Sequence, residues 1–238
     1  MKALILSAGL GTRLKPFTDH HPKALAPVNG QPLLQRNIQY LQQQGIFDVV
    51  VNVHHFADQI IAALEENKGW GSRFEISDER DAVLETGGGL IKARPLLDGN
   101  ESFAVMNADV LTDLDLRSML QHHKTSGALS TLAVTNRTSS RHFLFDAQNR
   151  LCGWGNAATG EQKIRIEASS LQPKAFSGIH LIHPRIFNHI DREGKFSIVD
   201  VYLDLAASQP IYGFDHSDGK FIDVGKPESI AKAEQMFK

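Results

Sequence analysis

The sequence predicts an α/β fold in which helices flank a mainly parallel, mixed sheet, and three observations support this prediction. Short apolar runs alternate with amphipathic helical patterns through the first half of the chain. The first of these runs leads directly into a glycine-rich turn. With 238 residues, of which 42% are hydrophobic, the chain can bury one large core or one core with a smaller annex. Such alternation implies βαβ units, with sites outside the carboxyl ends of the strands.

The first half of the chain carries this alternation most clearly. Residues 2–7 form a short apolar run bounded by glycines, which predicts a buried strand. Leu34, Ile38 and Leu41 recur with helical spacing and predict an amphipathic helix over 31–44. The remaining predicted elements of this half are a strand at 48–53, a helix at 57–67, a strand at 74–77, a helix at 88–94, a strand at 102–106 and a helix at 114–124.

The pattern changes after about residue 126. Residues 143–154 predict a hairpin that turns at 146–149, whereas 155–174 are polar and irregular and predict no element. The other predicted elements are strands at 129–135, 176–182, 211–214 and 221–224, and helices at 184–190, 198–207 and 227–237. Because no repeat or linker interrupts the chain, we expect a single domain over 1–238, with halves at 1–126 and 127–238.

Composition excludes several classes of protein. The net charge of −2 provides no basic field for general nucleic-acid binding. The single cysteine, Cys152, excludes a disulfide framework or a thiolate metal cluster within one chain. The apolar run near the N-terminus is too short for a signal peptide or a membrane span. We interpret the sequons at Asn100 and Asn136 as chance matches, and expect a cytoplasmic soluble protein that does not bind membranes.

The glycine-rich stretch AGLGTRLKPFT is typical of loops that hold phosphate, and its pattern can be compared with those of the known phosphate-binding loops. The chain lacks the Gly-Lys-Ser/Thr triplet of a Walker loop. Gly9 and Gly11 fit the dinucleotide fingerprint in part, but Leu14 stands at its third glycine. Asn52 ends the second strand, where that fingerprint needs an acid to bind a ribose. A tight turn with incidental basic residues remains the alternative.

The same stretch resembles the opening of the nucleotide-sugar pyrophosphorylases, which join a nucleoside triphosphate to a sugar 1-phosphate. The positions that match the family pattern are Ala8, Gly9, Gly11, Thr12, Arg13, Leu14, Pro16, Phe17, Thr18, Pro22 and Lys23. The chain departs from the pattern at Ala24, where the family usually has proline or glutamine. The resemblance implies a Rossmann-like nucleotide-diphospho-sugar transferase fold, with a nucleotide-binding half at 1–126 and a sugar-binding half at 127–238. Nucleotide-binding residues would then be Ala8, Gly9, Gly11 and Thr12.

The chemistry of that reaction explains the residue types in the loop. Attack of a sugar phosphate on the α-phosphorus needs no protein nucleophile, so positioning and charge neutralisation carry the rate. Glycines let backbone N–H groups approach the phosphates closely. Arg13 offers a planar fork for the β- and γ-phosphates, and Lys23 a compact cation for charge developing near the α-phosphate.

Two aspartates are the predicted ligands of Mg²⁺, the cofactor that such phosphoryl chemistry requires. Asp109 follows a strand and resembles the family's Gly-Asp motif, with Ala108 in place of the glycine. Asp223 lies in FIDVGKP, which resembles the family's Trp-x-Asp-Val/Ile-Gly-Thr-Pro, although Lys226 replaces the threonine. The alternative for Asp109 is a turn-capping role.

Further site residues follow from the resemblance. The stretch 83–89 resembles the family's second nucleotide loop, in which Gly88 would admit the nucleotide and Glu85 would meet the sugar; a plain helix N-terminus is the alternative. Glu79 stands where relatives often place a residue that reads the base. Asn107 and Gly178, the latter in a Phe-Ser-Gly-Ile strand, complete the predicted sugar site.

The chain lacks the Glu-Lys-Pro segment whose lysine grips the sugar phosphate in most relatives, and Lys163 is one possible replacement. This absence, with Glu-Thr-Gly-Gly-Gly and Phe-Ser-Gly-Ile, resembles the N-acetylmuramate 1-phosphate uridylyltransferases of cell-wall recycling. UTP is therefore the expected nucleotide. GTP with mannose 1-phosphate or a heptose 1-phosphate is the alternative, because a carboxylate at Glu79 could accept two donors from guanine. A catalytically silent nucleotide-sensing subunit is the alternative of another class. The sequence does not predict the oligomeric state.

Overall fold

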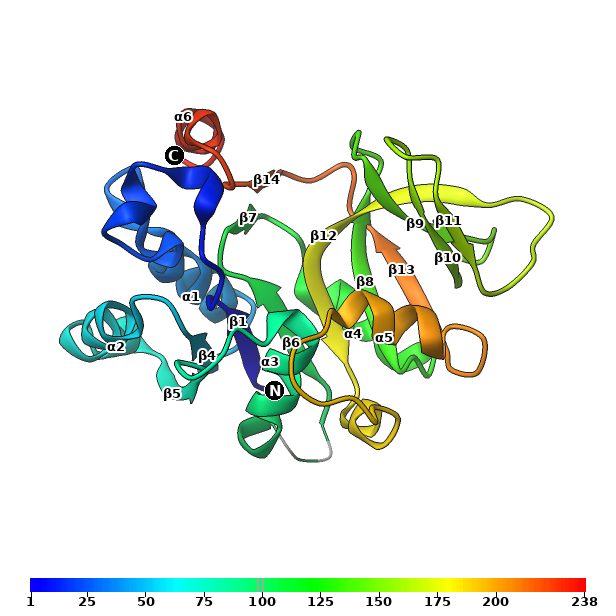
Figure 1. Ribbon diagram of the computed structural model, residues 1–238, viewed down its shortest axis with the longest axis horizontal. Coiled ribbons are helices and arrows are strands. Elements are labelled where there is room, and N and C mark those ends of the chain that lie inside the picture. The colour runs from blue at the N-terminus through cyan, green and yellow to red at the C-terminus, as the bar shows by residue number, and fades with distance from the viewer. Residues whose placement is uncertain (98, 100) are drawn as a thin grey trace.

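The computed structural model describes residues 1–97, 99 and 101–238, so Asn100 of the first sequon lies outside the described residues. Its main sheet has the strand order β11-β10-β9-β12-β6-β1-β4-β5, and β8 joins β12 to β13 (Figure 1). Four adjacent strands of this sheet are parallel: β1 (Ala3–Leu6), β4 (Asp48–Val53), β5 (Arg73–Asp78) and β6 (Phe103–Asn107). Strands β8 and β13 form another parallel pair. The predicted α/β fold with a mixed, partly parallel sheet is confirmed.

Strand β1 lies between β4 and β6 and pairs in parallel with both. Its last residue, Leu6, is in register with Asn52 on one side and with Asn107 on the other. Three strands therefore end at one level of the sheet. The loops that leave them converge there, as is usual for sites in α/β sheets.

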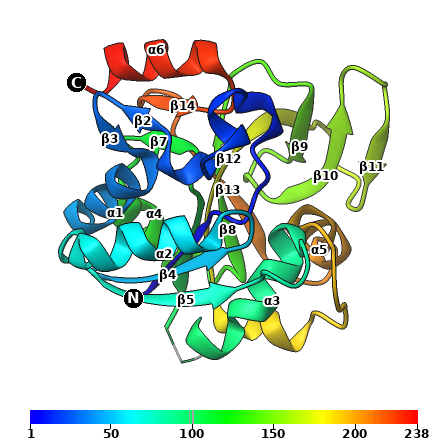
Figure 2. The same ribbon diagram turned by 60° about the vertical axis from the view of Figure 1, so that its left-hand side comes forward.

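Helices cover both faces of the sheet because side chains of a buried strand alternate between faces. Ala3 and Ile5 of β1 pack in a core with α1 (Leu33–Gln43), α2 (Ala57–Glu66) and α4 (Leu116–Thr125). Leu4 packs in a second core with α3 (Glu85–Leu97) and α5 (Ile198–Leu205). Figure 2 shows α3 and α5 side by side on their face of the sheet.

Strand β12 (Gln172–Ile182) connects the parallel strands to the second half of the chain. Residues 179–182 pair with β6, whereas 172–174 pair with β9 (Arg141–Phe145). The pairing with β8 is interrupted between Phe176 and His180, and Gly178 within this stretch has φ 71°. The other strands of this half are β8 (Ser130–Thr135), β10 (Leu151–Asn156), β11 (Gln162–Ile164) and β13 (Ile211–Asp215).

A small antiparallel pair lies in the upper part of the molecule in Figure 1. Strand β14 (Phe221–Asp223) pairs with β7 (Val110–Thr112), and α6 (Pro227–Met236) follows. The short strands β2 (Pro27–Val28) and β3 (Gln31–Pro32) form a second pair. A third core, with Leu14, Val28, Leu111, Val224 and Ala233, lies beneath these segments. The chain that carries Asp223 is thereby packed against the glycine-rich loop.

Most predicted elements are present, and the differences have physical causes. Helix α3 starts at Glu85 and extends to Leu97, beyond the predicted 88–94, because its glycines pack closely against residues 194–196. A short 3-10 helix, Pro184–Asn188, replaces the helix predicted over 184–190. Strand β11 was not predicted because its polar residues are partly exposed at a sheet edge. None of the helices in the described chain is both long and apolar enough to cross a membrane.

Two buried histidines lie in the cores without a charged partner. His180 on β12 hydrogen-bonds to the hydroxyl of Tyr202, and burial lowers the pKa of His180 to about 3. His123 on α4 lies between the hydroxyls of Ser102 and Thr131, and burial lowers the pKa of His123 to about 4. Both side chains are therefore neutral in the folded protein at neutral pH.

We expect His180 to make stability depend on pH. Below pH 6.5 the unfolded chain takes up a proton that folded His180 excludes, so stability present above pH 6.5 is lost as the pH falls toward 3. Between pH 7.5 and pH 5 this loss is about 2 kcal/mol. In urea denaturation, the free energy of unfolding of His180→Gln should fall by about 2 kcal/mol less than that of the wild type between pH 7.5 and pH 5. Substitution of the exposed His20 by glutamine should leave the wild-type loss unchanged. Equal losses in all three proteins would contradict the assignment.

Candidate active site

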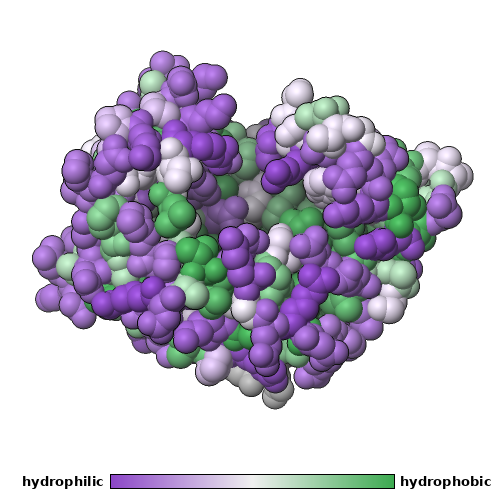
Figure 3. All heavy atoms as spheres, viewed as in Figure 1, coloured by the Kyte–Doolittle hydropathy of each residue, from purple (hydrophilic) through white to green (hydrophobic). Residues whose placement is uncertain are grey.

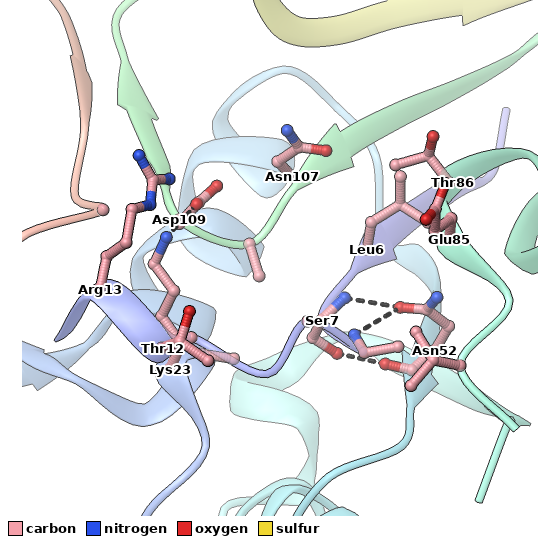
Figure 4. Close-up of a pocket in the computed structure, with 17 residues that line it drawn as sticks. Leu6, Ser7, Thr12, Arg13, Lys23, Asn52, Glu85, Thr86, Asn107 and Asp109 are labelled. Atoms are coloured by element: carbon pink, nitrogen blue, oxygen red, sulfur yellow. Dashed lines mark hydrogen bonds and ion pairs between the residues drawn. The ribbon is translucent and has the colours of Figure 1, made fainter. Parts of the chain in front are cut away.

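A cavity of about 340 Å³ opens where β1, β4 and β6 end. Figure 3 shows it as part of a deep hollow between the two lobes of the molecule. The predicted site residues that line it are Ala8, Gly9, Gly11, Thr12, Arg13, Lys23, Glu85, Asn107 and Asp109 (Figure 4). Ser7, Asn52 and Thr86, which the sequence did not predict, also line it. The remaining predicted residues, Glu79, Gly88, Gly178 and Asp223, are outside the lining.

The glycine-rich loop needs glycine at Gly11 for conformation and for space. Gly11 has φ 63°, and a Cβ there would lie 2.8 Å from Cγ2 of Thr18. The Thr18 hydroxyl donates to the carbonyl of Gly11 at 2.9 Å, and buried Leu14 anchors the following turn in the third core. Leu14, which departs from the dinucleotide fingerprint, is thus the residue that packs this loop against the core.

Asn52 at the end of β4 holds the start of the loop. Its Oδ1 accepts hydrogen bonds from the backbone N–H groups of Ser7, at 2.5 Å, and Ala8, at 3.2 Å. The Ser7 hydroxyl in turn donates to the Asn52 carbonyl. An acid at this position would bind a ribose in a dinucleotide site, whereas the amide here clamps the chain that enters the glycine turn.

The side chain of Glu79 in turn holds Asn52. Its Oε1 accepts from Nδ2 of Asn52 at 2.8 Å, and its side chain is buried. Burial raises the pKa of the Glu79 carboxyl, while the hydrogen bond from Asn52 lowers it. A Cβ at Gly89 would lie 2.7 Å from Oε1, so the carboxylate also packs against α3. Glu79 therefore lies beneath the cavity wall in this structure and faces Asn52.

The charged groups gather at the opposite end of the cavity (Figure 4). The Lys23 ammonium donates to Oδ2 of Asp109, and both side chains are largely buried. Arg13 extends toward Gly225, where a Cβ would lie 3.0 Å from its Nη2 and 2.7 Å from Oδ1 of Asp223. Two cations from the loop and two carboxylates from β6–β7 and β14 thus share one corner.

Asp109 and Asp223 are held close by the β7–β14 pairing. Asp223 is in register with Val110, and the Val224 N–H donates to the Asp109 carbonyl at 2.8 Å. Desolvation raises the pKa of the Asp223 carboxyl, and the Asp109 carboxylate raises it further, whereas Lys23, Arg13 and Arg137 lower it. A carboxyl whose ionisation is opposed by a neighbouring carboxylate forms, together with that neighbour, a fitting environment for a divalent cation.

In the described chain, no three His, Cys, Asp or Glu side chains come together as a metal site. A cation at Asp109 and Asp223 would therefore take its other ligands from substrate phosphates and water. This donor set fits Mg²⁺, which is commonly bound by one or two carboxylates together with phosphate oxygens.

The second predicted loop forms the first turn of α3. Glu85 has φ 59° and pairs with Lys195 at 3.4 Å. The N–H groups of Gly87 and Gly88 approach the carbonyl of Phe196, and a Cβ at Gly88 would lie 2.1 Å from the Gly194 carbonyl oxygen. The space beside Gly88 is thus occupied by the backbone of Gly194, outside the cavity, whereas Glu85 and Thr86 line the cavity.

The other two predicted sugar residues, Asn107 and Gly178, are neighbours in space. Asn107 lines the cavity, and a Cβ at Gly178 would lie 2.5 Å from its Nδ2. Gly178 therefore lets β12 approach Asn107 closely. Lys163 is on edge strand β11, where its ammonium lies 5.5 Å from the centre of the Trp154 ring and 3.6 Å from Glu161. It is outside the cavity lining.

Comparison with known proteins identifies related chains. A family model described as "Nucleotidyl transferase" matches residues 2–144. N-acetylmuramate α-1-phosphate uridylyltransferase from Caulobacter vibrioides is 32% identical, over 98% of this chain and 95% of that protein. Mannose-1-phosphate guanylyltransferase 1 from Arabidopsis thaliana is 29% identical, over 100% of this chain but 64% of that protein.

A solved structure with the same architecture is UDP-glucose pyrophosphorylase from Acinetobacter baumanii. Its TM-score is 0.79 at 19% identity, over 98% of this chain and 91% of that one. This likeness confirms the predicted nucleotide-diphospho-sugar transferase fold.

We expect Asn52→Ala to release the loop. The substitution leaves two backbone N–H groups and the Glu79 carboxylate without their partner, which should lower the free energy of unfolding by about 1–3 kcal/mol. Triphosphate binding, measured by calorimetry, should weaken as well, because the loop is no longer held. Asn67→Ala, which removes an amide from an exposed helix end, is the matched control and should retain binding. Wild-type affinity in Asn52→Ala would show that the clamp is dispensable.

Proposed function

The chain belongs to the nucleotidyl transferase family and is a sugar-1-phosphate nucleotidyltransferase, and we propose that it joins UTP to N-acetylmuramate 1-phosphate in a Mg²⁺-dependent reaction. The observation that carries the proposal is the corner at which Arg13, Lys23, Asp109 and Asp223 meet beside the cavity. Charge neutralisation and alignment are what such a reaction asks of a protein.

An oxygen of the sugar phosphate attacks the α-phosphorus of the triphosphate. A new P–O bond forms, the bond between the α-phosphorus and its bridging oxygen breaks, and that oxygen leaves with pyrophosphate. Arg13 would hold the leaving phosphates with its planar fork, and Lys23 would neutralise charge on the α-phosphate. Before substrate enters, the ion pair with Asp109 holds the Lys23 ammonium at the cavity.

Asp109 and Asp223 would hold Mg²⁺, which, when bound, neutralises phosphate charge and aligns the phosphate oxygens. The backbone from Ala8 to Thr12 would contact the phosphates, and Glu85 and Asn107 the sugar. Gly88 and Gly178 would act through the close packing they permit on either side of the cavity.

One feature favours UTP over GTP. Glu79, the carboxylate that could read guanine, is buried and directed at Asn52. The chain also spans 95% of the N-acetylmuramate uridylyltransferase relative, which favours that sugar phosphate. The proposed N-acetylmuramate substrate implies a role in cell-wall recycling. A cytoplasmic location remains a prediction.

The deciding experiment crosses the four common nucleoside triphosphates and dTTP with N-acetylmuramate, N-acetylglucosamine, mannose and heptose 1-phosphates, and measures pyrophosphate. UTP with N-acetylmuramate 1-phosphate should give the highest kcat/KM, and EDTA should abolish the signal until Mg²⁺ is restored. A kcat/KM for GTP at least tenfold above that for UTP, about 1.4 kcal/mol of transition-state preference, would overturn the nucleotide assignment. Nucleotide binding without turnover of any pair would indicate a regulatory subunit.

Lys23→Ala should lower kcat by roughly 10²-fold or more, the scale of removing one preorganised charge donor. The matched control is Lys15→Ala, because Lys15 lies on the same loop but is exposed and paired with Asp19. Steady-state kinetics of both variants under saturating substrates test this. If Lys23→Ala retained the kcat of the Lys15 variant, Lys23 would have no part in the chemical step.

A further inference from the structure

Arg137 is a third cation that interacts with the charged corner of the site, and it comes from the second half of the chain. It follows β8 in the segment that leads to β9. Its Nη2 donates to the carbonyl of Phe176 at 2.7 Å, and its Cζ lies 5.1 Å from the centre of the Phe221 ring. The guanidinium is therefore held between β12 and β14, the strands that border the cleft on this side.

Both contacts place Arg137 beside groups already assigned to the site. Phe176 is two residues before Gly178, which packs on Asn107, and Phe221 is two residues before Asp223. Arg137 and Asp223 also interact electrostatically, each favouring the charged form of the other. The positive charge of Arg137 therefore acts on the same corner as Arg13 and Lys23, but from the sugar-binding half.

The guanidinium retains capacity for a ligand. Arginine has five N–H donors, and among the described residues the structure records one hydrogen bond from this side chain, to Phe176. Stacking on an aromatic ring and one backbone hydrogen bond fix the plane of the group without using its full fork. A fixed, partly unused fork suits the two oxygens of a phosphate.

The proposed reaction requires a second phosphate, that of the sugar 1-phosphate, on the side of the sugar-binding half. Arg13 and Lys23 belong to the nucleotide loop and are committed to the triphosphate. The attacking phosphate must reach the α-phosphorus from the sugar-binding half, and it is a second dianion that needs a cation. Lys163 lies on edge strand β11 beside Glu161, whereas Arg137 stacks on Phe221, two residues before Asp223, so Arg137 is better placed to meet it.

We infer that Arg137 binds the phosphate of the sugar 1-phosphate and orients it for attack. The inference rests on the proposed nucleotidyl transfer and adds the residue that recognises the second substrate. A carboxylate on the sugar is the competing target, since N-acetylmuramate carries one on its lactyl group. The phosphate is favoured because Arg137 stacks on Phe221, two residues before Asp223, where the two phosphates must meet, whereas the lactyl group is attached at C3 of the ring.

The test compares Arg137→Ala and Arg137→Lys with the wild type, with UTP and each sugar phosphate varied in turn. Arg137→Ala should raise KM for N-acetylmuramate 1-phosphate at least tenfold and leave KM for UTP within about twofold, and Arg137→Lys should recover part of the loss. Arg141→Ala removes an exposed arginine four residues away and should retain both constants. Thermal melting of all variants checks that each is folded.

A second sugar phosphate separates the two anions. N-acetylglucosamine 1-phosphate, which lacks the lactyl carboxylate, is measured as a substrate or as a competitive inhibitor. Its KM or Ki should rise in Arg137→Ala by the same factor as that of N-acetylmuramate 1-phosphate. A rise confined to the carboxylated sugar would overturn the inference and make Arg137 a carboxylate reader.

The remaining outcomes are also decisive. Unchanged constants in a folded Arg137→Ala, equal rises for UTP and sugar phosphate, or a tenfold rise in Lys163→Ala alone would each reject Arg137 as the phosphate residue. If the wild type turns over no sugar 1-phosphate with any triphosphate, the proposed function itself fails. An active wild type with an unaffected Arg137→Ala instead refutes only this inference.

Discussion

The parallel pairing of β1 on both sides is the constraint on which the site depends. Because Leu6 is in register with Asn52 and Asn107, the residues that follow three strands emerge at one level. Asn52 then clamps the chain on one side of β1, and Asn107 supports Gly178 on the other. A shift of one residue in either pairing would turn these side chains to the opposite face of the sheet.

The charges at the cleft are balanced toward anionic substrates. Arg13, Lys23 and Arg137 contribute three positive charges, and Asp109 and Asp223 two negative ones, so these five groups sum to +1. Lys23 pairs with Asp109, and Lys23, Arg13 and Arg137 lower the pKa of the Asp223 carboxyl against the burial and the Asp109 carboxylate that raise it. The two carboxylates would be less favourable in this corner without those cations.

The sequence predicted the strands of the parallel sheet well because they are apolar runs whose burial depends little on partners. Strand β4 occupies the predicted residues 48–53, since both of its faces are covered by helices. The start of α3 was misplaced because a run of glycines has weak helix propensity, which contacts with residues 194–196 override. Edge strand β11 gave no signal, because only its pairing with β10 makes it a strand.

The candidate site was predictable where one short stretch carries it, as in the glycine loop. Asn52 and Arg137 could not be found in this way, because their partners are 44 or 45 residues and 39 residues away in the chain. The partner of α3 is more distant still: Phe196 accepts hydrogen bonds from its glycines. Strand β12 also continues one sheet into the other half. The two halves therefore cannot be exchanged between relatives as separate modules. A new sugar preference would instead have to arise by single substitutions around the cavity, with the shared strand β12 and the segment packed against α3 retained intact.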